Sequence, residues 1–264
     1  AEAVPDGEGY RLTGRWNFSS GFRHATWLAA LATVRHPVDD QQEGDDVLTM
    51  LFPKKDAEPL DVWHVKGLRG TGSFSFEVQD LYVPGIRTFV SGSPREEGPL
   101  YVMPMTLLFA AGFATVALGV ARAALDTAIE LAGVKRRDRG LDGLFRDMSA
   151  VQREIGQAEA VWRSARAFLL EAASAAWEGA SKAHSVTTEE RIRLRLASTH
   201  AIRQAAEVVD VAYQVGGSDS IFARNPIQRR FQDVHVITQQ VQGRMGRYET
   251  AGQFFLGLEP KGAF

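Results

Sequence analysis

Two neighbouring serines and a glycine near the start of the chain are the first residues whose types and spacing suggest chemistry. Phe18, Ser19, Ser20 and Gly21 close the segment that begins at Gly9. A serine hydroxyl can donate or accept a hydrogen bond, and a glycine lets the main chain approach a flat ring closely. These residues suit contact with an aromatic heterocycle. The alternative interpretation is a Ser-Gly turn between two strands.

Hydroxyl and glycine residues recur in the segment 63–73, which ends with Thr71, Gly72 and Ser73. The pattern fits either a ligand-facing loop or a glycine-rich hairpin without a ligand. Far along the chain, Gln214 precedes Gly216 and Gly217, where exposed backbone N–H groups would suit an anion. The same glycines also suit the end of a helix.

The elements that must position these residues differ between the two halves of the chain. Residues 1–101 carry short apolar runs between turn residues, which predicts a small β-domain. We expect a buried strand over 27–34, a second strand over 47–52, and a half-buried strand over 74–78. The alanine-rich remainder, 102–264, predicts a helical bundle.

Four long helices are expected in the second half. Thr187 followed by Glu190 is a capping-box pattern, and Gly216 with Gly217 ends the same periodic stretch. The apolar run that starts at Thr106 is interrupted later by Arg122, Asp126 and Glu130, which favours a buried bundle helix over a membrane span. The expected ranges are 104–133, 144–178, 187–215 and 228–248, so the fold class is α+β.

Composition excludes several classes of function. The 264 residues contain 30 basic and 32 acidic side chains, a net charge of -2, with no basic patch for nucleic acid or membrane. No cysteine is present, which excludes disulfides, a thiolate nucleophile and a cysteine-based zinc site. We expect no metal site. The first residues lack the features of a signal peptide, so a cytoplasmic location is expected.

The segment from Gly9 to Gly21, GYRLTGRWNFSSG, resembles the strand-turn of the acyl-CoA dehydrogenases. Its ending Phe-Ser-Ser-Gly is similar to flavin-dependent aromatic hydroxylases built on the same fold, such as the oxygenase components of 4-hydroxyphenylacetate 3-hydroxylase. In that family this turn packs beside the flavin and bonds its N5 atom. The resemblance implies that Ser19 lies nearest N5, with Ser20 second, and that the flavin is contacted by Trp16, Phe18, Ser19, Ser20 and Gly21.

Three further segments resemble the same family in the same order. GLRGTGS at 67–73 implies cofactor or substrate contact by Thr71 and Ser73. The Q-x-x-G-G segment implies nucleotide binding across a subunit boundary by Gln214, Gly216 and Gly217. Segment 225–240 matches the start of the last helix, where the hydroxylases place a histidine, here His235.

Arginines after the first long helix resemble a family position that pairs with a flavin phosphate. Arg137 and Arg139 are the candidates, with Arg136 beside them. A guanidinium fork suits a phosphate, and a basic helix end exposed to water is the alternative.

One departure separates the hydroxylases from the dehydrogenases. The commonest dehydrogenase base, a glutamate, falls on Val241 when the two patterns are aligned through His235. Glu154 could be proposed as a base elsewhere, but it sits in an ordinary helix pattern that favours a surface charge. An acyl-CoA dehydrogenase using FAD is the second hypothesis, and a non-catalytic bundle protein is the third.

The resemblance therefore implies the oxygenase component of a two-component flavin monooxygenase. Reduced flavin, FMN or FAD from a separate reductase, would react with molecular oxygen to a C4a-hydroperoxide that hydroxylates an aromatic or polycyclic substrate. Ser19 and His235 are the expected catalytic residues, since a histidine can act as a base near neutral pH. A homotetramer is implied. The family's N-terminal helical domain has no counterpart in this sequence, so we expect the sequence to be incomplete for activity.

Overall fold

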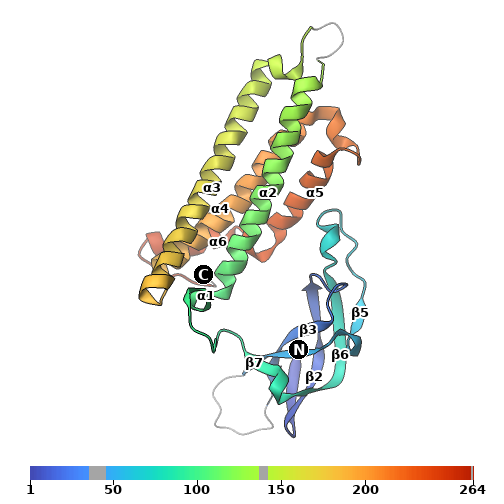
Figure 1. The fold of residues 1–264 in the computed structure, drawn as a ribbon, viewed down its shortest axis with the longest axis vertical. Helices are drawn as coiled ribbons and strands as arrows, with labels where there is room; N and C mark the ends of the chain where they lie inside the picture. The colour runs from blue at the N-terminus through green and yellow to red at the C-terminus, as the bar shows by residue number, and fades with distance from the viewer. Residues whose placement is uncertain (36–45, 137–141, 263) are drawn as a thin grey trace. The chain divides into compact units, whose positions relative to one another are not determined.

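The computed structural model describes residues 1–35, 46–136, 142–262 and 264. It divides the chain into two compact units, Ala1–Arg95 and Glu96–Phe264 (Figure 1). The first unit is built of strands and the second of helices, which confirms the α+β class.

Among the described residues of the first unit, seven strands form one sheet. The sheet order is β5-β6-β2-β1-β3-β4-β7, and the β1–β3 pair is parallel while the other pairs are antiparallel. Their bounds are β1 Glu2–Asp6, β2 Gly9–Ser19, β3 Trp27–Val34, β4 Val47–Pro53, β5 Glu58–Leu60, β6 Phe74–Pro84 and β7 Thr88–Val90.

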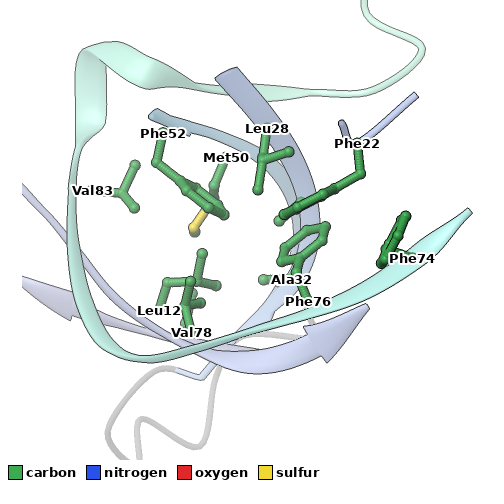
Figure 2. Close-up of a cluster of buried hydrophobic side chains, with 12 residues drawn as sticks. Leu12, Phe22, Leu28, Ala32, Met50, Phe52, Phe74, Phe76, Val78 and Val83 are labelled. Carbon is green, nitrogen blue, oxygen red and sulfur yellow. The ribbon is translucent and has the colours of Figure 1, made fainter. Parts of the chain in front are cut away.

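Aromatic and aliphatic side chains fill the inside of this sheet. Figure 2 shows the strands curving around a cluster in which Phe22, Phe52 and Phe76 lie near Met50 and Leu12. Phe22 and Phe76 stack with ring centroids 6.0 Å apart. This barrel-like core fixes β2 and β6. The predicted hydroxyl residues lie at the end of β2 and in the loops beside these strands: Ser19 ends β2, Ser20 follows it, and Thr71 and Ser73 precede β6.

The predicted burial is wrong for two of the expected strands. Strand β3 alternates, with Leu28, Ala30, Ala32 and Val34 inward and Trp27 exposed, so it is half-buried rather than buried. The start of β6 is buried on both faces, because Ser75 is also enclosed and donates a hydrogen bond to Asn17 Oδ1 at 2.8 Å.

Three long helices of the second unit run alongside one another, and α4 packs against α2, α3 and α5 (Figure 1). Buried alanines on α2 and α4 let the helix axes approach closely. The helices are α1 Pro99–Val102, α2 Met105–Val134, α3 Ser149–Ala183, α4 Thr188–Gly216, α5 Pro226–Gln239 and α6 Gly246–Phe255. Helix α2 is long and apolar enough to cross a membrane, but here it is a central bundle helix.

The sequence predicts the start of α4 correctly and the start of α3 less well. The capping box is present, since Glu190 N–H donates to Thr187 Oγ1 at 3.2 Å and Thr187 N–H donates to the Glu190 carboxylate at 2.8 Å. Helix α3 begins at Ser149, later than expected, because the short 3-10 helix η4 (Phe145–Asp147) precedes it.

The expected helix over 228–248 is wrong, because α5 ends at Gln239 and the 3-10 helix η6 (Val241–Gly243) separates it from α6. Side chains of α4 spaced four residues apart bind the polar groups of this break. Arg195 donates to Gln242 Oε1, Thr199 Oγ1 donates to Gln242 O at 3.1 Å, and Arg203 Nε donates to Gly243 O at 2.8 Å. These bonds replace those that a continuous helix would make.

Candidate functional site

The hydroxyl turn is shaped by a bulge in β2. Trp16 pairs with Phe76 and Ser19 pairs with Phe74, so Asn17 and Phe18 together face one residue of β6. Phe18 has a φ of 59°, which is unfavourable for a side chain with a Cβ, and its side chain is 76% exposed. A bulge of this kind re-aims the residues at its end, and here it turns an aromatic ring outward.

A chain of hydroxyl oxygens links this turn to the loop before β6. Ser20 Oγ lies 2.8 Å from Ser73 Oγ, and Ser73 Oγ lies 2.8 Å from Thr71 Oγ1. Thr71 Oγ1 donates to the carbonyl of Leu68 at 2.8 Å. We call these three side chains the hydroxyl relay. It brings together three of the residues predicted from sequence.

The main chain fastens the same two segments. Gly21 N–H donates to Thr71 O at 2.8 Å, and Gly21 has a φ of 80°, which requires glycine. Among the described residues, the hydroxyl of Ser19 has no hydrogen-bond partner. Trp16 is held elsewhere, because its Nε1 donates to Leu31 O at 2.9 Å and its ring stacks on Phe76.

A pocket of about 640 Å³ opens beside the relay, within the first unit. Its lining includes Arg23, His24, Trp63, His64 and Arg69. The ring of Trp63 meets the ring of Phe18 edge-on at 6.3 Å, so the pocket adjoins the exposed phenylalanine. The sequence prediction missed these pocket residues, although Arg23 and His24 directly follow the turn.

In the helical unit, His235 is held by a carboxylate. Its Nε2 lies 2.8 Å from Asp210 Oδ1, which joins α5 to α4 across 25 residues of sequence. Phe231 packs edge-on against the imidazole at 4.5 Å, and Tyr213 packs on Phe231 at 4.5 Å. Both members of the pair are about two-fifths exposed, so a ligand can reach them. The sequence prediction missed Asp210, since nothing local to it marks it as a partner of His235.

The glycine segment at the end of α4 is more enclosed than the sequence predicted. Gly217 has a φ of 55°, as its position requires, but its N–H donates to the carbonyls of Tyr213 and Gln214. That N–H is therefore not offered to an anion. The positively charged side chain of Lys135 lies beside these glycines. Its Nζ donates to Gly216 O at 2.8 Å and pairs with Asp219 at 2.8 Å.

The other predicted positions differ in what the structure says of them. Arg137 and Arg139 lie outside the described residues. Val241 starts η6, so no carboxylate stands at the position of the commonest dehydrogenase base. Among the described residues, no three histidine, aspartate or glutamate side chains cluster to hold a metal ion.

Comparison with known proteins finds one matching family and several similar proteins. The family described as "Acyl-CoA dehydrogenase, C-terminal domain" matches residues 111–243. An indole-3-acetate monooxygenase of Pseudomonas putida is 33% identical over 96% of this chain, which spans 64% of that protein's length. A pigment production hydroxylase of Rhodococcus erythropolis is 30% identical over 98% of this chain and 68% of its own length.

Solved structures give the same result for the fold. XiaF from a Streptomyces species, solved with FADH2 and glycerol, matches with a TM-score of 0.87 and 25% identity. The 3-HSA hydroxylase from Rhodococcus sp. RHA1 matches with a TM-score of 0.86 and 25% identity. In each case 99% of this chain and 68% of the other chain are covered. Both units therefore have counterparts in these structures.

Proposed function

Because this chain belongs to the acyl-CoA dehydrogenase family, as its C-terminal domain match and its relatives establish, we propose that it is part of a flavin-dependent monooxygenase. The protein would be the oxygenase component of a two-component system that hydroxylates an aromatic small molecule. The relatives named above are monooxygenases and hydroxylases, and a further relative from a Rhizobium species is named as an FADH2-dependent resorcinol hydroxylase, oxygenase component.

The observation that carries the proposal is the His235–Asp210 pair. A histidine beside the hydroxyl of a phenol can remove its proton and make the ring a better nucleophile. The carboxylate of Asp210, 2.8 Å from Nε2, fixes the orientation of the imidazole.

The residues of the hydroxyl turn fit a flavin. Phe18 offers an exposed ring face or edge to a flat ligand, and the unpartnered hydroxyl of Ser19 is available to a polar ring atom. Gln214, Gly216 and Gly217 remain candidates for the nucleotide through groups other than the Gly217 N–H, which bonds within the helix end. Lys135 beside them would supply a positive charge for a phosphate, which would then share it with Asp219. When bound, reduced flavin would supply the activation of molecular oxygen.

The source of reduced flavin is proposed to be a separate reductase. The sequence contains no glycine-rich G-x-G-x-x-G fingerprint for a nicotinamide nucleotide. A dehydrogenase acting on acyl-CoA is disfavoured, because Val241 cannot take a proton from a thioester substrate. The choice between FMN and FAD follows from binding measurements on both.

The test uses the protein as its gene encodes it, supplied anaerobically with reduced FMN or FAD and then mixed with oxygen. Indole-3-acetate and resorcinol serve as probes, and mass spectrometry measures gain of one oxygen atom. We expect oxygenated product from at least one probe, and less free hydrogen peroxide than in the same reaction without a probe. Bleaching of the flavin by an acyl-CoA, with no oxygenated product, would instead establish the dehydrogenase.

Variants then test the role of the pair. His235→Ala should lower the rate of phenol hydroxylation about a hundredfold, the usual lower range for a general base, with flavin affinity unchanged. Asp210→Asn should lower the rate less, because the amide oxygen can still bond the imidazole and hold its orientation. Glu207→Gln is the control, because Glu207 is exposed one turn away on α4 and accepts a hydrogen bond from Gln204. Equal loss of flavin binding and rate in His235→Ala would mean a structural histidine.

A further inference from the structure

We propose that Arg203 is a positioning residue for His235, because it holds the last turn of α5 where the imidazole meets Asp210. The role of His235 as a base rests on the proposed function. The contacts that support the role of Arg203 do not depend on that function, and they lie within the second unit, on α4, α5 and η6.

Helix α4 holds α5 at two points. At the first, Asp210 Oδ1 lies 2.8 Å from His235 Nε2. At the second, Arg203 Nη2 donates to Thr238 O at 3.4 Å. Arg203 and Asp210 are seven residues apart, which is about two helical turns, so they lie on the same side of α4. Thr238 follows His235 by about one turn, so a shift of α5 at the second point also moves the first.

The contact at Arg203 fixes the end of α5. The last carbonyls of a helix have no partner within it, and here the guanidinium supplies donors to them. Its Nε donates to Gly243 O at 2.8 Å, and its Nη2 donates to the same oxygen as well as to Thr238 O. A Cβ on Gly243 would lie 3.0 Å from both Ile202 Cγ2 and Thr238 O, so η6 packs closely against α4 at this point.

A hydroxyl group links this contact to His235. Thr238 is 4% exposed, and its Oγ1 donates to the carbonyl of His235 at 2.7 Å. The side-chain amide of Gln239 donates to the same hydroxyl at 3.1 Å. The last turn of α5 is therefore braced from the main chain of His235 to the guanidinium of Arg203, which restricts rotation of the turn that carries the imidazole.

The contact with Asp210 determines which nitrogen of His235 can accept a proton. An ionised carboxylate can only accept a hydrogen bond, so the hydrogen in this contact belongs to Nε2. The lone pair of the neutral ring then lies on Nδ1, which has no hydrogen-bond partner among the described residues. If α5 rotates away from α4, the contact with Asp210 is lost and the lone pair is misplaced. A misplacement of about 1 Å can lower a rate about a hundredfold.

Variants of Arg203 test this role by two independent measurements on the protein as its gene encodes it. NMR of isotope-labelled histidine nitrogens measures how much of the neutral His235 ring carries its hydrogen on Nε2, and His235→Ala assigns the signal. Hydroxylation of resorcinol gives kcat and KM. Arg203→Gln should lower the Nε2–H fraction and lower kcat about tenfold, while KM and flavin affinity change by less than about twofold. Arg203→Lys keeps the charge and can still donate to a carbonyl, so it should show a smaller loss in each.

Arg191 provides the matched control on the same helix. It lies about three turns before Arg203, and its Nε also donates to a backbone carbonyl, that of Val186, at 3.1 Å. Arg191→Gln should leave the tautomer and kcat unchanged. When Arg203→Gln is combined with His235→Ala, kcat should be no lower than in His235→Ala alone, because a residue that acts through His235 then has nothing to position.

The outcomes distinguish the role of Arg203 from the proposed function. An unchanged tautomer in Arg203→Gln, or losses in kcat that multiply in the double variant, overturns the positioning role and leaves the monooxygenase proposal intact. If the wild type hydroxylates none of the probes, the monooxygenase proposal fails and the tautomer alone decides the role of Arg203. Thermal unfolding identifies a variant that does not fold, and if Arg203→Gln is one, Arg203→Lys decides by the same measurement.

Discussion

Among single residues, Phe18 has the conformation that the fold alone explains least. A positive φ costs a residue with a Cβ about 1–2 kcal/mol, and Phe18 recovers little of this by burial because its side chain is exposed. Strained residues that persist at the surface are frequent at ligand sites. The conformation of Phe18 therefore supports the proposal that this turn contacts the flavin.

Replacement of Phe18 by glycine should separate its two effects. Phe18→Gly relieves the positive φ, so we expect the free energy of unfolding to stay within about 1 kcal/mol of wild type or to rise. Affinity for reduced FMN should fall about tenfold, because an aromatic contact is lost. Urea unfolding and flavin titration measure the two quantities.

The control for this change is Asp80→Gly, at an exposed site with a φ of 50° away from the turn. It should relieve strain without changing flavin affinity. A loss of about 3 kcal/mol or more in Phe18→Gly would show that the ring supports the fold, as core aromatics do.

The residue scale also shows what sequence could find. Ser20, Thr71 and Ser73 were predicted because their hydroxyls stand in short segments with a recognisable order, and the structure joins them. Asp210 and the pocket residues Arg23 and His24 were missed, since their role depends on contacts made by folding and not on local spacing. The enclosed N–H of Gly217 was likewise invisible before the helix end was seen.

Among the elements, the break between α5 and α6 depends on α4. Arg195 is fully buried, and among the described residues its Nε has no hydrogen-bond partner. Burial, followed by the positive charge of Arg247, lowers the pKa of Arg195 to about 10. Its remaining nitrogens bind Gln242 Oε1 and Thr106 O, so one side chain fastens η6 to the start of α2.

Loss of this arginine should be costly. Arg195→Met leaves the buried Oε1 of Gln242 without this donor and removes the bond to Thr106 O, so we expect a loss of about 1–3 kcal/mol in the free energy of unfolding, measured with urea. Arg193→Met, two residues away, removes only an exposed ion pair with Glu171 at 2.7 Å and should change stability by less than about 1 kcal/mol. Similar losses in both variants would contradict this role for Arg195.

The contact between α2 and α3 predicts a pH effect. The hydrogen bond from Arg122 lowers the pKa of Glu159 below its usual value of 4.5, with Arg163 assisting. A carboxylate with a lowered folded pKa adds stability above its unfolded pKa, and this contribution is lost as pH falls through the folded pKa.

Glu159→Gln should therefore be less stable than wild type at pH 7, by about 1 kcal/mol, and the difference should shrink below pH 4. Urea unfolding at pH 7 and pH 3 measures the difference. Glu171→Gln, in an exposed pair on the same helix, should show little change at either pH. A constant difference for Glu159→Gln would rule out its ionisation as the cause.

For the whole molecule, the order of a β-unit before a helical bundle was predictable from the pattern of apolar and turn residues, since the periodicities of strands and helices differ clearly. The long helices were predicted to within a few residues except where α4 breaks the last one. A local pattern cannot report side chains that come from another helix, and this explains why the error fell at 240–245.

An exposed apolar face of α2 suits contact between copies of this chain. Met105, Phe109 and Val116 lie on one exposed stripe with Gly112 and Gly119. We expect the protein to be a homotetramer in solution, and Phe109→Glu with Val116→Glu to give smaller species by light scattering. Leu170→Glu, an exposed apolar position on α3, is the control. An unchanged mass in the double variant would exclude this stripe as an interface.

The bonds from α4 to η6 also bear on how such a bundle can be engineered or can diverge. The bend in residues 226–255 is specified by Arg195, Thr199 and Arg203, which lie on a different helix. The segment therefore is not a portable module: grafted into a bundle that lacks these three side chains, it would lose the partners that stabilise its break. Conversely, substitutions on α4 alone could reshape this region of the bundle without any change in its own sequence.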